Sequence, residues 1–153
     1  MNETQQPTFG IEKIYVKDLS LEVPGGPQAF MQQEQPQLEV QITHQSQRVN
    51  DVLFEVTLII TVTAKSGDKT LFLVEASQAG VFQIRGVPEQ DLPPVLGIVC
   101  PNVLFPYVRE TVSDLVNRAG FPPVLLAPVN FEAIYQQRAE AAKAQGPQIE
   151  VAH

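Results

Sequence analysis

Residues 98–131, IVCPNVLFPYVRETVSDLVNRAGFPPVLLAPVNF, predict one long amphipathic helix, a proline-rich crossing and the start of a second helix. Asn102 is a residue type that caps helix N-termini, and Gly120 stands where a helix C-terminus favours a left-handed residue. On a helical wheel of residues 103–119 the apolar arc covers close to half the circumference, more than the ~100° that a helix needs to lie on one sheet. We therefore expect the helix to be covered from two directions, by its own strands and by another subunit. The arc contains Leu104, Phe105, Val108, Thr111, Val112, Leu115, Val116 and Ala119.

Four stretches that precede this helix have the period-two alternation of β-strands. They cover residues 9–23, 38–42, 51–64 and 70–84. The third stretch is the clearest, because every second residue from Val52 to Ala64 is apolar and several are β-branched. No helical pattern separates the stretches, so we expect an antiparallel sheet, with a hairpin turn at Ser66-Gly67-Asp68.

The order of the elements, with strands first and helices last, predicts an α+β fold. We expect a four-stranded antiparallel sheet followed by a long central helix and a C-terminal helix that Asn130 caps. Pro24-Gly25-Gly26-Pro27 ends the first strand and leads into a crossover loop that reaches Pro36.

Residues 9–142 are expected to form a single domain, which is the simplest arrangement for a chain of 153 residues. Residues 1–8 are predicted to be a flexible arm. The last helix is expected to fade between residues 139 and 145, and residues 143–153 to form a disordered polar tail.

Composition and charge limit the classes of function. The formal charge of −7 argues against a nucleic-acid partner and favours cationic ones. A single cysteine, Cys100, excludes an internal disulfide and is typical of a reducing compartment. The N-terminal MNETQQPTF lacks the pattern of a signal peptide, and no apolar run approaches the ~20 residues of a membrane span. We expect a cytoplasmic protein without direct membrane insertion.

No group of residues has the spacing of a catalytic or metal site, so we expect no enzyme activity, cofactor or metal. Residues 67–70, GDKT, resemble the end of a phosphate-binding loop, but the upstream glycine is missing and a strand follows. Cys100 and His44 have the residue types of a nucleophile and base, although such a cysteine is more often a core residue. Asp18 and Glu22 would lie ~13 Å apart on one strand, too far for an acid–base pair.

The central block CPNVLFPYVRETVSDLVNRAGFPPVLLAPVNF, with IYVKDLSLEVP near the start and FLVEASQAGVF in the fourth strand, resembles SecB, the bacterial protein-export chaperone family. The match runs in order from Phe9 to Ala142. The resemblance implies a homotetramer, built as a dimer of dimers with the long helices between opposing sheets. It also implies that the protein holds unfolded precursor polypeptides without ATP and delivers them to the SecA motor. The expected tetramer interface contains Leu104, Val108, Val112 and Leu115.

The resemblance further implies that SecA docks its basic, zinc-bearing C-terminal segment on an acidic face of the sheet, so the zinc belongs to the partner. The carboxylates of the KDLSLE motif are Asp18 and Glu22, and we rank them first among the SecA-binding residues. The FLVEA element supplies Leu73, Glu75 and Ala76, some of which are expected to act indirectly through subunit packing. Carboxylates on a rigid strand steer a partner rich in Lys and Arg and fix its register.

The resemblance places the client groove between the crossover loop, the second strand and the last helix. Burial of client side chains there, at ~25 cal/mol per Å², gives affinity without sequence specificity. The crossover loop of the family often carries a tryptophan where this chain has Glu34, within QEQP. The alternative interpretation of the candidate residues is ordinary core. They are Phe30, Met31, Leu38, Val40, Ile42, Phe131, Ile134 and Tyr135.

Two other functions remain open from the sequence. One is a SecB-like chaperone that serves a toxin–antitoxin system, against which the pair Asp18 and Glu22 weighs. The other is a small α+β enzyme or ligand-binding protein that uses the groove as a pocket. It would bind small molecules saturably and have no affinity for unfolded polypeptide.

Overall fold

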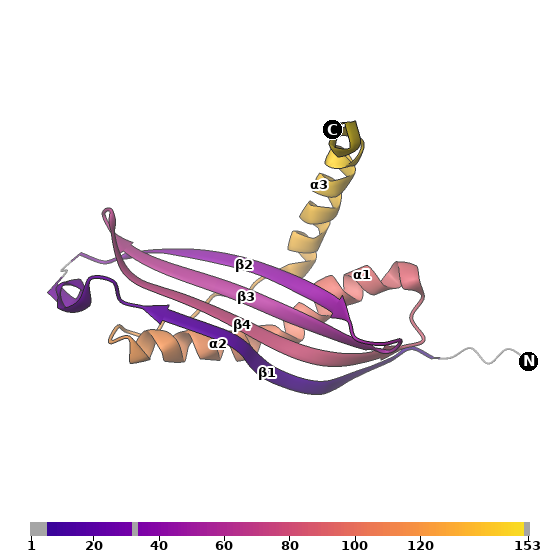
Figure 1. The fold of residues 1–153 in the computed structure, drawn as a ribbon, viewed down its shortest axis with the longest axis horizontal. Coiled ribbons are helices and arrows are strands. Elements are labelled where there is room, and N and C mark those ends of the chain that lie inside the picture. The colour runs from indigo at the N-terminus through magenta and orange to yellow at the C-terminus, as the bar shows by residue number, and fades with distance from the viewer. Residues whose placement is uncertain (1–5, 32–33, 152–153) are drawn as a thin grey trace, which may run out of the picture.

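The computed structural model describes residues 6–31 and 34–151, with side chains up to residue 144. Figure 1 shows a twisted sheet with helices on one side of it. The strands are β1 (Thr8–Glu22), β2 (Gln37–Arg48), β3 (Leu53–Ser66) and β4 (Lys69–Arg85). The helical segments are η1 (Gly26–Met31), η2 (Glu89–Asp91), α1 (Leu92–Pro94), η3 (Val95–Val99), α2 (Cys100–Arg118) and α3 (Phe131–Val151). The predicted α+β class and the order of its elements are confirmed.

The four strands form one antiparallel sheet in the order β1-β4-β3-β2, which confirms the predicted sheet. A two-residue turn joins β3 to β4, and Gly67 adopts a φ of +63° there, a conformation that glycine permits without strain. Because β1 and β2 are the two edges of the sheet, their connection has to cross its full width. This explains the long segment between them, which contains η1.

The two faces of the sheet differ in burial. The face that packs on α2 is apolar, because β3 and β4 place every second side chain there. Its buried members are Phe54, Val56, Leu58, Ile60, Val62, Phe72, Val74, Ala76, Phe82 and Ile84. The intervening residues, including Leu73, Glu75 and Ser77 of β4, point to the opposite side, which we call the outer face.

The central helix begins earlier than the sequence predicts. The chain is helical from Glu89 to Arg118, so Asn102 lies inside the helix and the prediction that it caps the N-terminus is wrong. Pro101 has no N–H to donate, and η3, a π-helical turn, precedes it. In this turn the N–H of Cys100 bonds to the carbonyl of Val95, five residues back. This wider turn keeps the helix continuous up to Pro101 and beyond it.

Part of the second cover of α2 comes from the same chain, and the expectation of another subunit on this helix stays a prediction. Phe105 packs edge-on against Phe131 at the start of α3, with ring centroids 6.0 Å apart. Leu126, from the crossing between α2 and α3, joins the same buried cluster. The crossing and the start of α3 therefore cover part of the wide apolar arc, while Thr111 and Leu115 stay half-buried.

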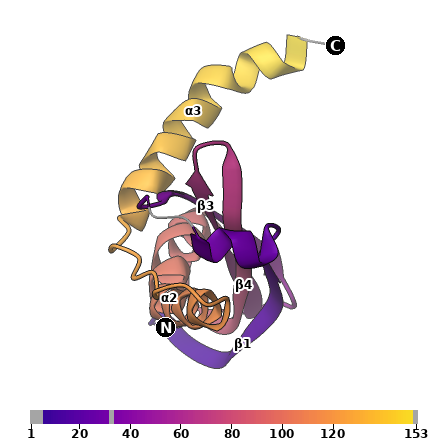
Figure 2. The same cartoon turned by 90° about the vertical axis from the view of Figure 1, so that its left-hand side faces the viewer.

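Two predictions about the last helix have different outcomes. The Oδ1 atom of Asn130 accepts a hydrogen bond of 3.0 Å from the N–H of Ala133, which confirms the predicted cap. The predicted end of the helix between residues 139 and 145 is wrong, because the backbone of α3 is helical to Val151. The alanine- and glutamine-rich sequence favours helix and carries the backbone past Pro147. Figure 2 shows that α3 extends away from the sheet towards the C-terminus.

The helical path from Glu89 to Arg118 is 30 residues long, and its most apolar window has a mean hydropathy of 1.3. By length and composition alone it could cross a membrane, contrary to the expectation from uninterrupted apolar runs, because the window tolerates isolated polar residues. The structure gives the helix another role. It packs on the sheet, and Leu104, Val108 and Val112 have no exposed surface.

Candidate functional site

An apolar groove of about 540 Å³ lies between η1, the start of β2 and the crossing that follows α2. Three aromatic rings from distant segments meet in its lining. The ring of Phe121 stacks on that of Phe30, with centroids 5.0 Å apart, and its centroid is 4.9 Å from that of Phe72. A groove of this size with aromatic walls suits apolar side chains of a ligand.

Gly120 is the residue that allows η1 to approach the end of α2. It has a φ of +93°, which confirms the predicted left-handed C-terminus of the helix. A Cβ atom at this position would lie 2.9 Å from the ring of Phe30. The same glycine therefore ends α2 and leaves room for one wall of the groove.

Only part of the predicted client-binding set comes together at the groove. Phe30 and Leu38 line it, as predicted, and Val40 follows Leu38 on the same side of β2. Both β2 residues are more than 40% exposed, since α2 covers β3 and β4 but not β2. Ile42 is half-buried against the core. Met31 is 75% exposed and does not line the groove.

The three predicted residues of α3 lie away from the groove. Phe131 is 2% exposed and belongs to the core, which is the alternative interpretation. Ile134 is half-buried against the same core. The ring of Tyr135 packs on the backbone of η3, where a Cβ atom at Gly97 would lie 2.8 Å from its Cδ1 atom.

Residues of the crossing and of β4 form the part of the groove that the sequence interpretation missed. Phe121, Val124 and Leu125 line it from the crossing, and Leu71 and Phe72 line it from β4. Leu125 is 81% exposed, the most exposed of the large apolar residues in the described part of the chain. The available signal was the FPPVLL sequence, in which prolines keep the chain extended and so present consecutive apolar residues to different sides.

A polar contact joins α3 to β2 beside Tyr135. The Nη1 atom of Arg138 is 3.3 Å from the Nδ1 atom of His44. Because a guanidinium can only donate, Nδ1 has to be the acceptor, which requires a neutral imidazole with its proton on Nε2. Burial, and secondly the charge of Arg138, lower the pKa of His44 below its ordinary value of 6.5, in agreement with this assignment.

The outer face brings four of the five predicted SecA-binding residues together. Glu22 pairs with Leu73, and Asp18 pairs with Ser77 beside Glu75, so the set spans neighbouring positions of β1 and β4. Within the described part of the chain, the carboxylates of Asp18 and Glu22 are exposed and make no ion pair or side-chain hydrogen bond. They are therefore available to a cationic partner.

Ala76, the fifth residue of that set, does not reach the outer face. It is 1% exposed and points towards α2, because it alternates with Glu75 along β4. Its effect on any outer-face partner has to be indirect, through packing, as the sequence interpretation allowed for some of the β4 residues.

A nearby carboxylate on the outer face is already satisfied. Glu55 of β3 accepts hydrogen bonds from the hydroxyl of Tyr15 and from the ammonium of Lys17, the latter at 2.9 Å. The bonds from Lys17 and Tyr15 lower the pKa of Glu55, and the bond to Glu55 raises the pKa of Tyr15 to about 12. This cluster joins β1 to β3. The ammonium of Lys17, the residue before Asp18, is bound to Glu55 and is not paired with Asp18.

The residues considered for chemistry do not form a reactive site. Cys100 is fully buried, and burial raises the pKa of its thiol to about 12, so it is a core residue rather than a nucleophile. Residues 67–70 form the hairpin turn. Among the described residues, no three His, Cys, Asp or Glu side chains are close enough to hold a metal ion.

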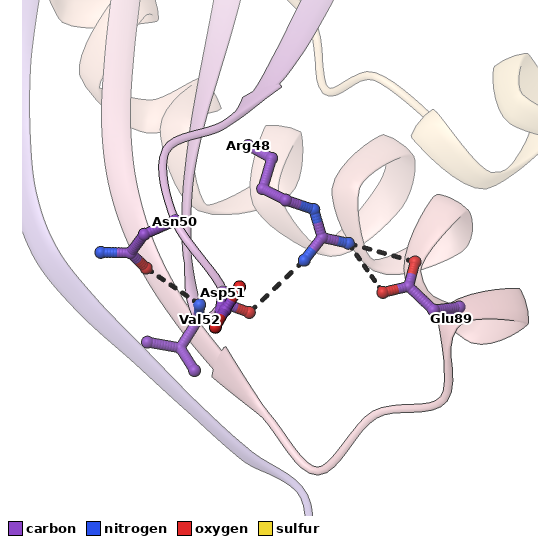
Figure 3. Close-up of polar contacts among 5 residues, drawn as sticks. All are labelled: Arg48, Asn50, Asp51, Val52 and Glu89. Carbon is purple, nitrogen blue, oxygen red and sulfur yellow. Dashed lines mark hydrogen bonds and ion pairs between the residues drawn. The ribbon is translucent and has the colours of Figure 1, made fainter.

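A second hollow, of about 310 Å³, lies at the end of the sheet opposite the groove. Polar contacts among its lining residues stabilise the fold. Arg48 donates to both carboxylate oxygens of Glu89, at 2.8 and 3.1 Å, and to the carbonyl of Asp51 at 3.4 Å (Figure 3). The side chain of Asn50 accepts from the N–H groups of Val52 and Leu53. These contacts fix the β2–β3 turn against the start of the helical segment.

The predicted tetramer-interface residues lie mostly inside the subunit. Leu104, Val108 and Val112 are fully buried against the sheet of the same chain, so they offer no surface to a second subunit. Leu115 is half-buried. The apolar surface that stays exposed is on the other side, at Val99 at the end of η3 and Tyr107 of α2, which are 42% and 50% exposed.

Comparison with known proteins identifies close relatives over nearly the whole chain. Residues 2–142 match the family model for SecB, the preprotein translocase subunit. The protein-export protein SecB of Chromobacterium violaceum is 63% identical over 147 residues, which cover 94% of this chain and 98% of that protein. The SecB of Neisseria meningitidis is 54% identical over 145 residues, covering 94% and 99%.

A solved structure has a similar fold. It is the SecB-like chaperone of Mycobacterium tuberculosis in complex with a peptide from the HigA1 antitoxin. The TM-score is 0.60 over 79% of this chain and 90% of that one, at 19% sequence identity. At this identity the likeness concerns the fold.

Proposed function

The chain belongs to the SecB family of protein-export proteins, and we propose that it holds unfolded precursor polypeptides in its apolar groove and delivers them to SecA through its outer face. Its membership of the family makes it a chaperone of the Sec export pathway. In this proposal the groove binds the client and the outer face binds SecA, so the two steps use separate parts of the fold.

The client site is the groove between η1, β2 and the crossing. The observation that supports it is the exposed apolar surface of Phe30 and Leu125, beside Phe121 and above the buried ring of Phe72. Burial of client side chains there contributes ~25 cal/mol per Å² without reading a sequence. The row from Leu38 to Val40 extends this surface along β2, whose free edge can pair with an extended chain. A folded protein hides both features and is not bound.

The motor site is the patch of Asp18, Glu22, Leu73 and Glu75 on the outer face. Its carboxylates are held on paired strands, so their spacing is fixed before the partner arrives. The zinc-bearing, basic C-terminal segment of SecA is the partner that we propose for them. No residue of the patch has a role in holding zinc, which the partner carries.

The assembly that we propose is a homotetramer in the cytoplasm that performs no catalysis. Two apolar surfaces are available for contacts between subunits. One is the exposed side of α2 with Val99 and Tyr107, and the other is the edge strand β1, where Phe9, Ile11, Val16 and Leu19 are each more than 40% exposed. Repetition of the groove on several subunits gives avidity for one long client.

Charge reversal tests the motor site. Asp18→Lys is expected to weaken binding of the zinc-loaded C-terminal segment of SecA at least about tenfold, because it replaces attraction by repulsion at an exposed contact. Asp68→Lys, at the β3–β4 turn, is the matched control and should bind as the unmodified protein does. Isothermal titration calorimetry measures both. An unchanged affinity of the Asp18 variant would reject the assignment.

Holding of a client tests the groove. Leu125→Ser is expected to reduce the ability of the protein to delay refolding of a slow-folding precursor at stoichiometric amounts without ATP. The side chain is 81% exposed, so the substitution removes apolar surface without opening a cavity in the core. The affinity of this variant for the SecA segment serves as its control and should not change. Equal holding by the variant and the unmodified protein would argue against the groove.

A further inference from the structure

Glu75 lies at the centre of a regular grid of side chains on the outer face. Antiparallel pairing places residues of β1, β4 and β3 in rows across the sheet, with side chains on the same side. The three consecutive rows are Glu22–Leu73–Thr63, Ser20–Glu75–Thr61 and Asp18–Ser77–Ile59. Glu75 thus has a carboxylate of β1 in the row on each side of its own.

Three carboxylates in this patch repel one another. In the described part of the chain none of the four ion pairs involves Asp18, Glu22 or Glu75, and the neighbouring cation of Lys17 is bound by Glu55. An unrestrained Glu75 side chain could lean towards β1 or towards β3, since the long, exposed side chain has several rotamers of similar energy. A restraint on Glu75 therefore changes how the three charges are presented.

Thr61 supplies such a restraint. Its hydroxyl donates a hydrogen bond of 2.9 Å to the Oε2 atom of Glu75, from the strand opposite to the one that carries Asp18 and Glu22. The bond draws the carboxylate towards β3 and leaves Oε1 free to accept from a partner. Thr63, two residues along on the same face, lies opposite Leu73 and makes no side-chain hydrogen bond with any residue that the structure describes. Of Thr61 and Thr63, Thr61 is therefore the one whose hydroxyl restrains Glu75.

We propose that Thr61 is a positioning residue of the motor-docking patch, whose hydroxyl holds the Glu75 carboxylate over β3 at a fixed separation from Asp18 and Glu22. The patch then offers a basic partner three separate anionic points instead of a variable cluster, and the partner does not have to order Glu75 when it binds. This inference rests on the proposed function of the outer face and extends it to β3, on which the predicted site has no residue.

The experiment is a titration of the full-length protein with the zinc-loaded C-terminal segment of SecA. Thr61→Val removes the hydroxyl but keeps the β-branched shape that suits a strand. It is expected to weaken binding about three- to tenfold, the range for ordering one side chain with many rotamers on binding. Thr61→Ser retains the hydroxyl and should bind nearly as the unmodified protein does. Thr63→Val, the matched control, should have no effect.

A double-mutant cycle separates positioning from a general effect on the strand. In a Glu75→Ala background, Thr61→Val should cause no further loss of affinity, because the group that it positions is absent. The midpoints of thermal unfolding of the Thr61 and Thr63 valine variants should agree, and client holding should be unchanged. An equal loss in both backgrounds, or no loss from Thr61→Val, would overturn the role of Thr61.

Asp18→Asn in the same titration distinguishes that failure from failure of the docking surface. If Asp18→Asn weakens binding and Thr61→Val does not, the outer face remains the motor site and only the positioning role is rejected. If neither variant changes the affinity, the outer face is not the docking surface, and both proposals fail together.

Discussion

Glu34 gives this groove a charge at its edge. Its side chain is exposed in the segment before β2, and it is the one ionisable group among the described residues that line the groove. The rest of that lining is mainly aromatic, aliphatic and proline side chains. An exposed carboxylate next to an apolar surface favours a ligand that carries a cation beside its apolar residue, by an amount that solvent keeps small.

Substitution of Glu34 should therefore change selectivity more than affinity. Glu34→Gln is expected to weaken binding of an apolar peptide that carries one lysine about two- to fivefold, and to leave the neutral version of the peptide unaffected. The difference should shrink as salt is added. Fluorescence anisotropy of the two labelled peptides measures this, with Glu110→Gln on α2, outside the groove, as the control. A loss that is equal for both peptides would contradict it.

For single residues, the sequence predicted the side of an element on which a side chain lies better than it predicted whether that side chain is buried. Period-two alternation placed Asp18 and Glu22 on one face of β1, and the structure agrees. The same alternation separates Ala76 from Glu75, but a motif carried over as a block does not distinguish the two faces. Phe131 was placed in the groove by the family resemblance, which does not show what covers a side chain, and it is 2% exposed.

Among the elements, the π-helical turn η3 determines how α3 attaches. Gly97 lies within this turn, where the absence of a side chain admits the ring of Tyr135. One helical turn further along α3, Arg138 reaches His44 of β2. These two contacts fix the first part of α3 against β2 and η3, while the rest of the helix extends away from the sheet (Figure 2).

The contact between His44 and Arg138 should depend on pH. The pKa of His44 is lowered in the folded protein, so its neutral form is favoured by folding. The stabilisation is fully present above the ordinary value of 6.5 and is lost as the pH falls below it, because a protonated ring cannot accept from Arg138. Amide hydrogen exchange of residues 132–139, corrected for intrinsic rates, should accelerate relative to that of β3 between pH 7.5 and pH 5.5.

His44→Gln is the matched variant for this prediction. Its amide oxygen can accept from Arg138 but does not titrate, so the relative exchange of α3 should no longer depend on pH. Identical pH profiles for the two proteins would exclude His44 as the cause.

The elements themselves were mostly predictable, and the errors have physical causes. The strands, the hairpin at Gly67 and the cap at Asn130 follow from local patterns and local hydrogen bonds. The start of the central helix was misplaced because Asn102 has the residue type of an N-cap, whereas a π-helical turn continues the helix back towards Glu89. The contribution of Phe121 to the groove depends on contacts with Phe30 and Phe72, far away in the sequence, and no local pattern reports those.

For the whole molecule, the two sides of α2 should respond differently to a charge. Val112→Asp buries a carboxylate in the core of one subunit and should lower the stability of folding by roughly 3–5 kcal/mol. Tyr107→Asp alters an exposed residue and should leave the fold intact but lower the mass of the assembly. Light scattering combined with thermal unfolding separates the two effects. If the Tyr107 variant still formed a full-size tetramer, the interface between subunits would not lie on this side of α2.

The alternation along β4 has a consequence for the order of events in export. Because Phe72 faces the groove while Leu73 and Glu75 face away from it, the two sites that we propose for the client and for SecA lie on opposite faces of the same strand. Neither has to leave before the other arrives. The proposal therefore implies that SecA can bind the protein while the client is still bound, so that transfer proceeds through a three-component complex without release of the client into bulk solvent.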